Sequence, residues 1–147
     1  LLVIGEGPHR ERMRAMFATE GLAEQVEFTG GVSEARKNEL VRQARVGLSL
    51  SFEEGWGLSI NEFLAAGLPV VAYDLPIFAH VFPGQLDLVR LGDRAGFADK
   101  LLVWLVDESA RLERGLVGRE FVKRYDYREV AGQELEVLLS LKNGVGA

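Results

Sequence analysis

Short runs of apolar residues alternate along the chain with longer segments whose apolar positions recur every three or four residues. The short runs are rich in Val, Ile and Leu, and Gly or Pro bounds most of them. Their length and composition predict five β-strands, at residues 1–5, 26–30, 46–51, 69–73 and 86–91. The segments between them predict four helices, at residues 8–20, 33–44, 57–66 and 76–82, of which Pro8 begins the first and Ser33 caps the second.

This alternation predicts the class of fold. Because parallel strands need a crossover between them, the pattern indicates an α/β fold with a parallel, doubly wound, Rossmann-like sheet in three layers. Ligands of such sheets bind beyond the carboxyl ends of the strands. From Asp93 onward the pattern is helical, and we expect three helices that cover the sheet, at about 94–107, 109–124 and 127–141, with Trp104, Phe121 and Tyr125 as packing residues.

Size and composition indicate a single domain and exclude several classes of function. The 147 residues, 48% of them hydrophobic, suffice for one continuous core. The net charge is −5 and Lys and Arg are scattered, so we expect no nucleic-acid partner. The chain has no cysteine, which excludes disulfides, thiol catalysis and cysteine-based zinc sites. The absence of cysteine is compatible with a reducing compartment, so we expect a cytoplasmic location. We expect no transmembrane segment, because no apolar run is long enough to span a bilayer.

The acidic excess is confined to one part of the chain. Residues 51–93 hold one basic and six acidic side chains, whereas the segments on either side are balanced. Within this part, "SFEEGWGLSINEFLAAGLPVV" places Glu54 and Glu62 eight positions apart around a Gly-Trp-Gly turn. A glycosidase pair would stand roughly 5–9.5 Å apart, whereas eight helical steps would cover about 12 Å. We therefore expect the two carboxylates to bind separate parts of a ligand.

The residues between the two glutamates indicate an anionic ligand. Gly55 and Gly57 allow the backbone to turn sharply and to approach a ligand, and the N–H groups of a first helical turn favour an anion. A nucleotide sugar has a polyol at each end and phosphates in the middle, which matches this order of groups. Ordinary roles fit as well, because Glu62 lies opposite the apolar face of its predicted helix and Glu54 could simply complement the helix dipole.

The segment "SFEEGWGLSINEFLAAGLPVVAYD", residues 51–74, closely resembles the signature of retaining glycosyltransferases with the GT-B fold, in particular family 4, the glycosyl transferases group 1. The matching positions are Ser51, Glu54, Gly55, Trp56, Gly57 and Glu62. "LLVIGEGP" (1–8), "VEFTGGVSE" (26–34) and "RYDYREVAGQELEVL" (124–138) extend the resemblance over most of the chain. It implies the C-terminal, donor-binding half of an enzyme that moves a sugar from a nucleoside diphosphate sugar to an acceptor glycan or lipid-linked sugar.

The resemblance also implies a role for each residue of the site. Glu62 would bind the ribose hydroxyls, and Glu54, the catalytic candidate, would contact the sugar. Val32 matches a position whose backbone lies near the nucleobase. Backbone N–H groups would bind the sugar and the diphosphate, at Gly55, Trp56, Gly57 and Leu58. Trp56 stands where Phe is commoner in the family, and a packing role for its ring is an alternative.

Other kinds of site find less support. With His9 and His80 as the only histidines and no Asp-x-Asp, we expect no metal, and no cofactor besides the donor substrate. "GEGPHR" (5–10) begins like a dinucleotide-binding motif, but Arg10 stands where its last Gly belongs. The first aspartate is Asp74, so the early aspartates of receiver domains are missing. A non-catalytic nucleotide-sugar-binding module and a nucleotide-sugar epimerase remain alternatives.

The acidic segment by itself is poorly suited to a diphosphate. Its one basic residue is Arg90, and an exposed helix N-terminus contributes only about 0.3–1 kcal/mol. The resemblance implies that an Arg and a Lys come from a strand–helix unit that precedes Leu1. We therefore expect the chain to lack that unit and the N-terminal acceptor-binding domain, and to be nearly inactive alone. The full-length protein would be cytoplasmic, with a peripheral position at the inner membrane as a variant of this expectation.

Overall fold

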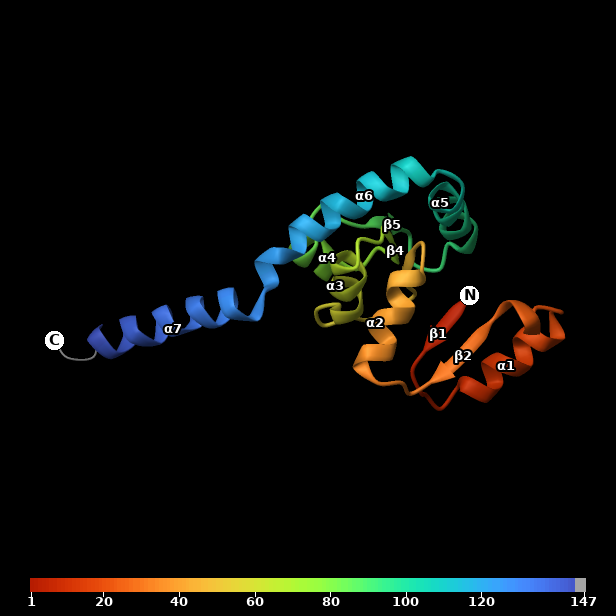
Figure 1. The fold of residues 1–147 in the computed structure, drawn as a ribbon, viewed down its shortest axis with the longest axis horizontal. Coiled ribbons are helices and arrows are strands. Elements are labelled where there is room, and N and C mark those ends of the chain that lie inside the picture. Colours follow the sequence, from red (N-terminus) through yellow and green to blue (C-terminus); the bar gives the residue numbers. More distant parts are fainter. Residues whose placement is uncertain (145–147) are drawn as a thin grey trace. The chain divides into compact units, whose positions relative to one another are not determined.

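The computed structural model describes residues 1–144, with side chains through residue 141. Strands and helices alternate up to residue 89, and helices follow (Figure 1). The strands are β1 (Leu2–Ile4), β2 (Glu27–Gly30), β3 (Gly47–Ser49), β4 (Val70–Tyr73) and β5 (Asp87–Val89). The helices are α1 (Arg10–Thr19), η1 (Ala23–Gln25), α2 (Glu34–Gln43), α3 (Leu58–Ala65), α4 (Pro76–Val81), α5 (Arg94–Val106), α6 (Glu108–Phe121), η2 (Val122–Tyr125) and α7 (Tyr127–Gly144).

The chain divides into two compact units, of which the first is Leu1–Gln43. Here β1 and β2 pair in parallel, with α1 as the crossover between them. Phe17 of α1 packs edge-on against Phe28 of β2, with ring centroids 6.1 Å apart. The Ser33 hydroxyl accepts a hydrogen bond from the Arg36 N–H (3.3 Å), which confirms the predicted cap of α2.

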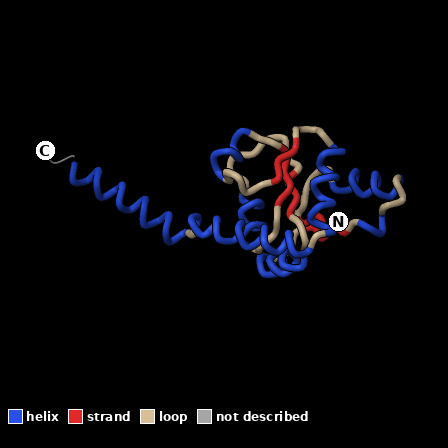
Figure 2. The backbone as a smooth tube through the Cα atoms, turned by 90° about the horizontal axis from the view of Figure 1, so that it is seen from above, coloured by secondary structure: helices blue, strands red, loops and turns tan. Residues whose placement is uncertain are grey.

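The second unit, Ala44–Ala147, is built on a parallel sheet of order β3-β4-β5. The central strand β4 is buried along its whole length, as expected for a strand with covered faces. Because side chains alternate along a strand, Val70 and Ala72 face one hydrophobic cluster, and Val71 and Tyr73 face another. The backbone view of Figure 2 shows these strands among the helices. Covering both faces is the basis of a doubly wound fold.

Different helices cover the two faces of this sheet. The first cluster contains apolar residues of α3, α4, α6 and η2, and the second contains Phe97 of α5. The Trp104 Nε1–H donates to an Asp87 carboxylate oxygen (2.6 Å), which ties α5 to β5. The Tyr125 hydroxyl donates to the Val81 carbonyl (2.5 Å), which ties η2 to α4. Trp104, Phe121 and Tyr125 are thus the packing residues that the sequence predicts.

The sequence predicts the individual strands and helices and the class of fold more fully than it predicts strand pairing and helix packing. The α/β class, the parallel winding and every predicted strand and helix are confirmed, although α1 begins at Arg10 and not at Pro8. The strands form two hydrogen-bonded groups in the described residues, because a strand pattern does not specify which strands pair. The prediction that all three C-terminal helices cover the sheet is wrong for α7, where Tyr127 and Leu138 are 87% and 63% exposed. The prediction of a single domain stays a prediction.

Candidate functional site

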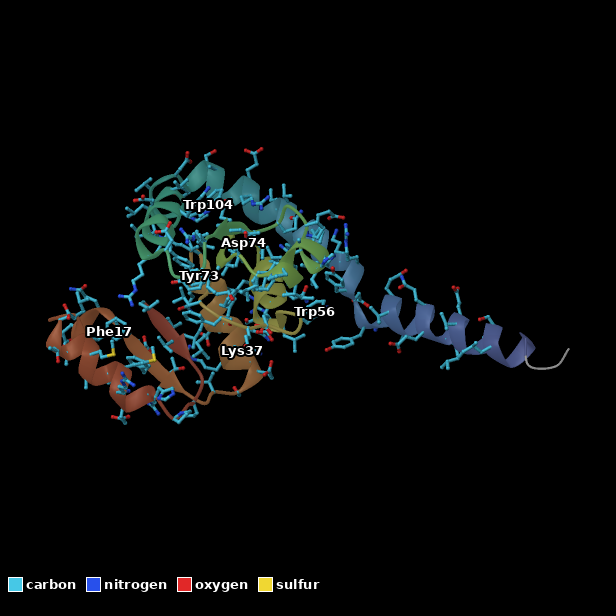
Figure 3. The ribbon with its side chains drawn as sticks, turned by 180° about the vertical axis from the view of Figure 1, so that it is seen from behind. Phe17, Lys37, Trp56, Tyr73, Asp74 and Trp104 are labelled. Atoms are coloured by element: carbon cyan, nitrogen blue, oxygen red, sulfur yellow. The ribbon has the colours of Figure 1, made fainter. Side chains whose placement is uncertain are left out.

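The carboxyl edge of the β3-β4-β5 sheet is where the parallel strands place their following loops. The chain continues beyond β3 into the loop 50–57, beyond β4 into Asp74, and beyond β5 into Arg90. Figure 3 shows Tyr73 and Asp74 next to each other at the end of β4. In parallel sheets this edge is the usual position of a ligand. The loop 50–57, with Glu53 and Glu54 of the acidic segment, therefore leaves the sheet at the edge where a binding site is expected.

Aromatic contacts anchor the loop 50–57 at two points. Phe52 lies edge-on to Tyr73, with ring centroids 5.8 Å apart. Trp56 packs edge-on against Phe82 (5.4 Å) and Tyr125 (4.8 Å). The Trp56 ring therefore has the packing role that is one of its two predicted roles. Its side chain is half-buried, and its role toward a ligand stays a prediction. Glu54 lies between the two anchors, half-buried.

The Glu54 carboxylate hydrogen-bonds to the main chain of its own loop. Its Oε1 accepts from the Gly55 N–H at 3.2 Å. This N–H is one of those predicted to bind the sugar or the diphosphate. A ligand at this position would have to replace the carboxylate at the amide, or share the site with it. Sequence patterns give no signal of this contact, because it depends on the rotamer of Glu54 and on the turn.

Gly57 is the N-cap residue before α3 and has a conformation that glycine favours. Its backbone has φ +100° and ψ +51°, in the left-handed region. A Cβ there would lie 3.0 Å from the Phe82 ring and 3.3 Å from Ile60 Cδ1, so the position also lacks space for a side chain. Glycine offers no side chain to cap α3, and no side-chain cap is present. The N–H groups of the first turn, beginning with the exposed Leu58, are thus left to solvent or to a ligand.

Glu62 lies one turn into α3, away from the buried face of the helix. Ile60 and Leu64 are buried, and two positions from either of them is nearly the opposite side of a helix. The Glu62 side chain is half-buried rather than fully exposed. Since α3 begins at Leu58, helical rise accounts for only about 6 Å of the Glu54–Glu62 separation. The 12 Å expected from an all-helical spacing therefore does not apply to this interval, because half of it is loop.

The structure brings most of the predicted site residues together, but it places Val32 in the other unit. Glu54 to Leu58 and Glu62 share the loop and the first two turns of α3. Val32 lies half-buried in the loop between β2 and α2 of the first unit. The loop beside it contains a contact that the sequence analysis missed: the Glu6 carboxylate accepts a hydrogen bond from the Gly31 N–H (3.0 Å). The motif "GEGPHR" was the available signal, and Arg10 in it is the partner of Glu6.

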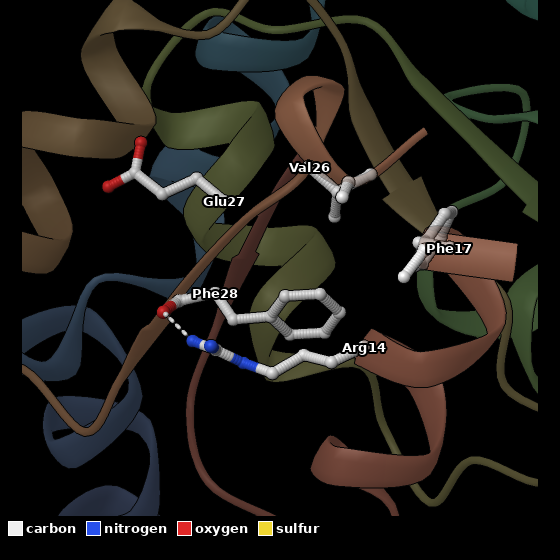
Figure 4. A pocket seen from close by; sticks show the side chains of 7 residues that line it. Arg14, Phe17, Val26, Glu27 and Phe28 are labelled. Atoms are coloured by element: carbon white, nitrogen blue, oxygen red, sulfur yellow. Dashed lines mark hydrogen bonds between the residues drawn. The ribbon is translucent and has the colours of Figure 1, made fainter. Parts of the chain in front are cut away.

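Two surface hollows lie outside the Glu54–Glu62 segment. One, of about 400 Å³, is lined by Arg90 to Asp93, next to the end of β5. The other, of about 420 Å³, belongs to the first unit and lies between α1 and β2 (Figure 4). There Arg14 donates to the Phe28 carbonyl at 3.4 Å, and its guanidinium lies 5.3 Å from the centre of the Phe28 ring. Arg14 is thus engaged by Phe28 on the wall of the hollow.

No group of three or more His, Cys, Asp or Glu side chains within the described part could hold a metal ion. Among the helices described, none is both long and apolar enough to cross a bilayer.

Comparisons of sequence identify the family of the chain. The glycosyl transferases group 1 family matches residues 1–114. The phosphatidyl-myo-inositol mannosyltransferase of Mycobacterium leprae is 37% identical over 140 residues, which are 93% of this chain and 37% of that protein. The GDP-mannose:cellobiosyl-diphosphopolyprenol alpha-mannosyltransferase of Xanthomonas campestris is 28% identical over 84% of this chain and 33% of its own. The chain thus spans about a third of the length of these relatives.

Solved structures support the same assignment at the level of the fold. A sucrose-phosphate synthase from Thermosynechococcus elongatus superposes with a TM-score of 0.87 at 25% identity, over 98% of this chain and 39% of that one. The crystal structure of TarM gives a TM-score of 0.80 at 24% identity, over 92% of this chain and 28% of that one. Given the family match, the shared α/β fold and the Glu54–Glu62 motif at the carboxyl edge of the sheet, the chain belongs to the glycosyl transferases group 1 family.

Proposed function

We propose that these residues form the donor-binding part of a retaining, family 4 glycosyltransferase that moves a sugar from a nucleoside diphosphate sugar to an acceptor. The observation that carries the proposal is the position of the Glu54–Glu62 segment. It leaves the carboxyl edge of a parallel sheet and enters a helix whose first turn has no side-chain cap. This edge is where α/β sheets bind nucleotides, and an uncapped helix N-terminus favours phosphate.

Each part of the donor has a proposed partner. The diphosphate lies against the backbone N–H groups from Gly55 to Leu58, and the Glu62 carboxylate accepts hydrogen bonds from the ribose hydroxyls. Glu54 faces the transferred sugar. Its Oε1 accepts from the Gly55 N–H, so a diphosphate at that amide would replace this contact or share the amide with it. The nucleobase lies near the Val32 backbone. The half-buried positions of Glu54, Glu62 and Val32 agree with surfaces that a ligand can cover.

The charge of the diphosphate requires cations from outside these residues. The segment 51–93 holds one basic and six acidic side chains, and main-chain dipoles compensate only part of a phosphate charge. We propose that a preceding strand–helix unit supplies the missing cations and that a further N-terminal domain binds the acceptor. Among the described strands β1 pairs only with β2, and β3 only with β4, so each has an edge for another parallel strand. The matched segment is only 37% of the Mycobacterium leprae relative, which agrees with additional parts.

The proposed reaction relies on positioning and on stabilising the leaving diphosphate. The acceptor hydroxyl attacks the anomeric carbon on the face that the diphosphate leaves, and a phosphate oxygen takes the hydroxyl proton, so the configuration is retained. These residues orient the donor and contribute no base. We propose that the transfer needs no metal, since amides and cationic side chains hold the diphosphate. The 147 residues alone would then bind donor weakly and show almost no turnover.

The names of the relatives indicate which substrates to test. The Mycobacterium leprae relative is named for mannosyl transfer to phosphatidyl-myo-inositol. The Xanthomonas campestris relative is named for mannosyl transfer from GDP-mannose to a cellobiosyl-diphosphopolyprenol. A related structure of an Anabaena protein contains UDP. We propose that the full-length enzyme uses an acceptor glycan or lipid-linked sugar. A lipid-linked acceptor would place a cytoplasmic enzyme peripherally at the inner membrane.

The experiment is a ligand screen followed by a transfer assay on the full-length protein. GDP, UDP and ADP are tested by thermal shift, because a ligand present at 100 times its Kd stabilises the folded state by about 2.7 kcal/mol. We expect one of them to raise the Tm, and the matching sugar donor to give a product with retained configuration, in EDTA as well as without it. A protein that none of the three stabilises would refute the proposal. Product released without acceptor would indicate an epimerase instead.

A further inference from the structure

The Glu6 carboxylate connects the two loops at the carboxyl ends of β1 and β2. Its Oε1 accepts from the Gly31 N–H at 3.0 Å, across 25 positions of sequence. Arg10 Nη1 lies 3.0 Å from both oxygens of the same carboxylate. One residue earlier, the Gly5 N–H donates to the Gly30 carbonyl at 2.9 Å. A main-chain bond and a side-chain bond therefore hold these loops together.

The conformation of the β2–α2 loop explains why it needs such a contact. Gly30 has φ +71°, which turns the chain out of β2 and directs the Gly31 N–H toward Glu6 rather than into the ladder. A Cβ on Gly30 would collide with the Glu6 carboxylate, so the close approach depends on glycine. Beyond Val32, the Ser33 hydroxyl caps α2. Val32 is thus held between a bound amide on one side and a helix cap on the other.

Charge favours the ionised, hydrogen-bonded form of Glu6. The Gly31 N–H lowers the pKa of Glu6 below its ordinary value, and the positive charges of Arg10 and Arg14 lower it further. Arg10 begins α1 and is the residue that breaks the dinucleotide-binding pattern of "GEGPHR". A glycine at this position could not pair with Glu6. The departure from the motif therefore has a structural consequence of its own.

We propose that Glu6, oriented by Arg10, is a positioning residue of the donor site: it holds the Gly31–Ser33 loop so that the Val32 backbone meets the nucleobase. This inference rests on the proposed function. Glu6 acts through the loop and not by touching the base. The Glu6 side chain is 60% exposed, so its removal leaves the Gly31 N–H to water and the core intact.

The test compares three variants of the full-length protein. Glu6→Ala removes the contact, Glu6→Gln keeps an oxygen that can accept from the Gly31 N–H, and Glu11→Ala is the matched control, an exposed glutamate of the first turn of α1. We measure hydrogen exchange of the Gly31 amide, and the affinities for GDP and for UDP. In Glu6→Ala we expect faster exchange at Gly31 and about threefold to tenfold weaker binding of the preferred nucleotide. We expect an intermediate effect in Glu6→Gln, none in Glu11→Ala, and the same GDP-to-UDP preference in all.

Specific outcomes would overturn the inference. If Gly31 exchanges faster in Glu6→Ala while nucleotide affinity is unchanged, the loop does not position the base. A changed GDP-to-UDP preference would mean that Glu6 contacts the base directly. If the parent protein binds nucleotide but Gly31 exchanges equally in all variants, the contact does not hold the loop. Failure of the parent to bind any of GDP, UDP and ADP would instead refute the proposed function, and the exchange data would still show whether the contact forms.

Discussion

Gly57→Ala is predicted to destabilise the second unit for two separable reasons. The left-handed backbone at Gly57 costs an L-residue about 1–2 kcal/mol. In addition, a Cβ would lie 3.0 Å from the Phe82 ring, 3.3 Å from Ile60 and 3.4 Å from Phe78. Such crowding in a packed core costs about 1–3 kcal/mol. The sum predicts that the free energy of unfolding falls by about 2–5 kcal/mol.

Two other glycines of the second unit separate these contributions. Gly84 also has a left-handed backbone, φ +70°, but an added Cβ would meet nothing within 4 Å. Gly84→Ala should therefore show only the conformational cost of about 1–2 kcal/mol. Gly55 has neither a left-handed backbone nor a neighbour within 4 Å. Gly55→Ala should change stability by less than about 0.5 kcal/mol.

Urea unfolding followed by tryptophan fluorescence measures these differences. Both tryptophans, Trp56 and Trp104, belong to the second unit, so the signal reports on it. We expect the highest urea midpoint for Gly55→Ala, a lower one for Gly84→Ala and the lowest for Gly57→Ala. The slopes of the free energy of unfolding against urea concentration should be equal. The reasoning would be refuted if Gly57→Ala were as stable as Gly84→Ala, because the contact with Phe82 would then have no energetic effect. Equal losses in all three variants would refute the conformational argument.

Of three further predictions, two concern single hydrogen bonds and the third concerns the ionisation of Glu6. Tyr125→Phe removes the donor to the Val81 carbonyl and should lower the free energy of unfolding by about 0.5–1.5 kcal/mol in urea titrations; an unchanged midpoint would contradict this. Trp104→Phe leaves the Asp87 carboxylate without its indole donor and should cost about 1–3 kcal/mol, part of which Asp87→Ala in the same background should restore. Because the folded-state pKa of Glu6 is lowered, its ionised form adds stability that is present above an ordinary value of 4.5 and lost as the pH falls through the folded-state pKa. Below about pH 4.5 the free energy of unfolding of the parent should therefore decrease more steeply with falling pH than that of Glu6→Gln. If the two curves of unfolding free energy against pH were parallel, they would contradict the role of the contact.

Much of the fold follows from local pattern, because local pattern specifies elements. The run "PVVAY" predicts a buried strand, and the structure has β4 at Val70–Tyr73 with every residue buried. Local pattern does not predict which other element a helix or strand packs against. The periodicity of α7 predicts a helix correctly, but its apolar side chains, such as Leu138, are exposed in the described structure. Pairing and packing depend on contacts between distant segments, which periodicity does not encode.

The candidate site shows the same division between local and non-local information. The sequence predicts an acidic loop at the carboxyl edge of the sheet, and it predicts the start of α3 within one residue of Leu58. Both predictions use local signals, namely the patterns of glycine and of charge. It does not reveal the Glu54–Gly55 bond, which depends on a rotamer, or the Glu6–Gly31 bond, which joins residues 25 positions apart. The roles of Glu54 and Glu62 toward a donor stay predictions.

The most direct test of the account is the affinity of the full-length protein for its nucleotide after Glu62→Ala. If Glu62 accepts hydrogen bonds from the ribose, its loss should weaken binding of the nucleoside diphosphate by about 1.5–3 kcal/mol, roughly 10-fold to 150-fold in Kd. Glu53→Ala, the control at an exposed glutamate of the loop 50–57, should leave the Kd unchanged. A folded Glu62→Ala variant with the Kd of the parent would contradict the central claim that the donor lies across this segment.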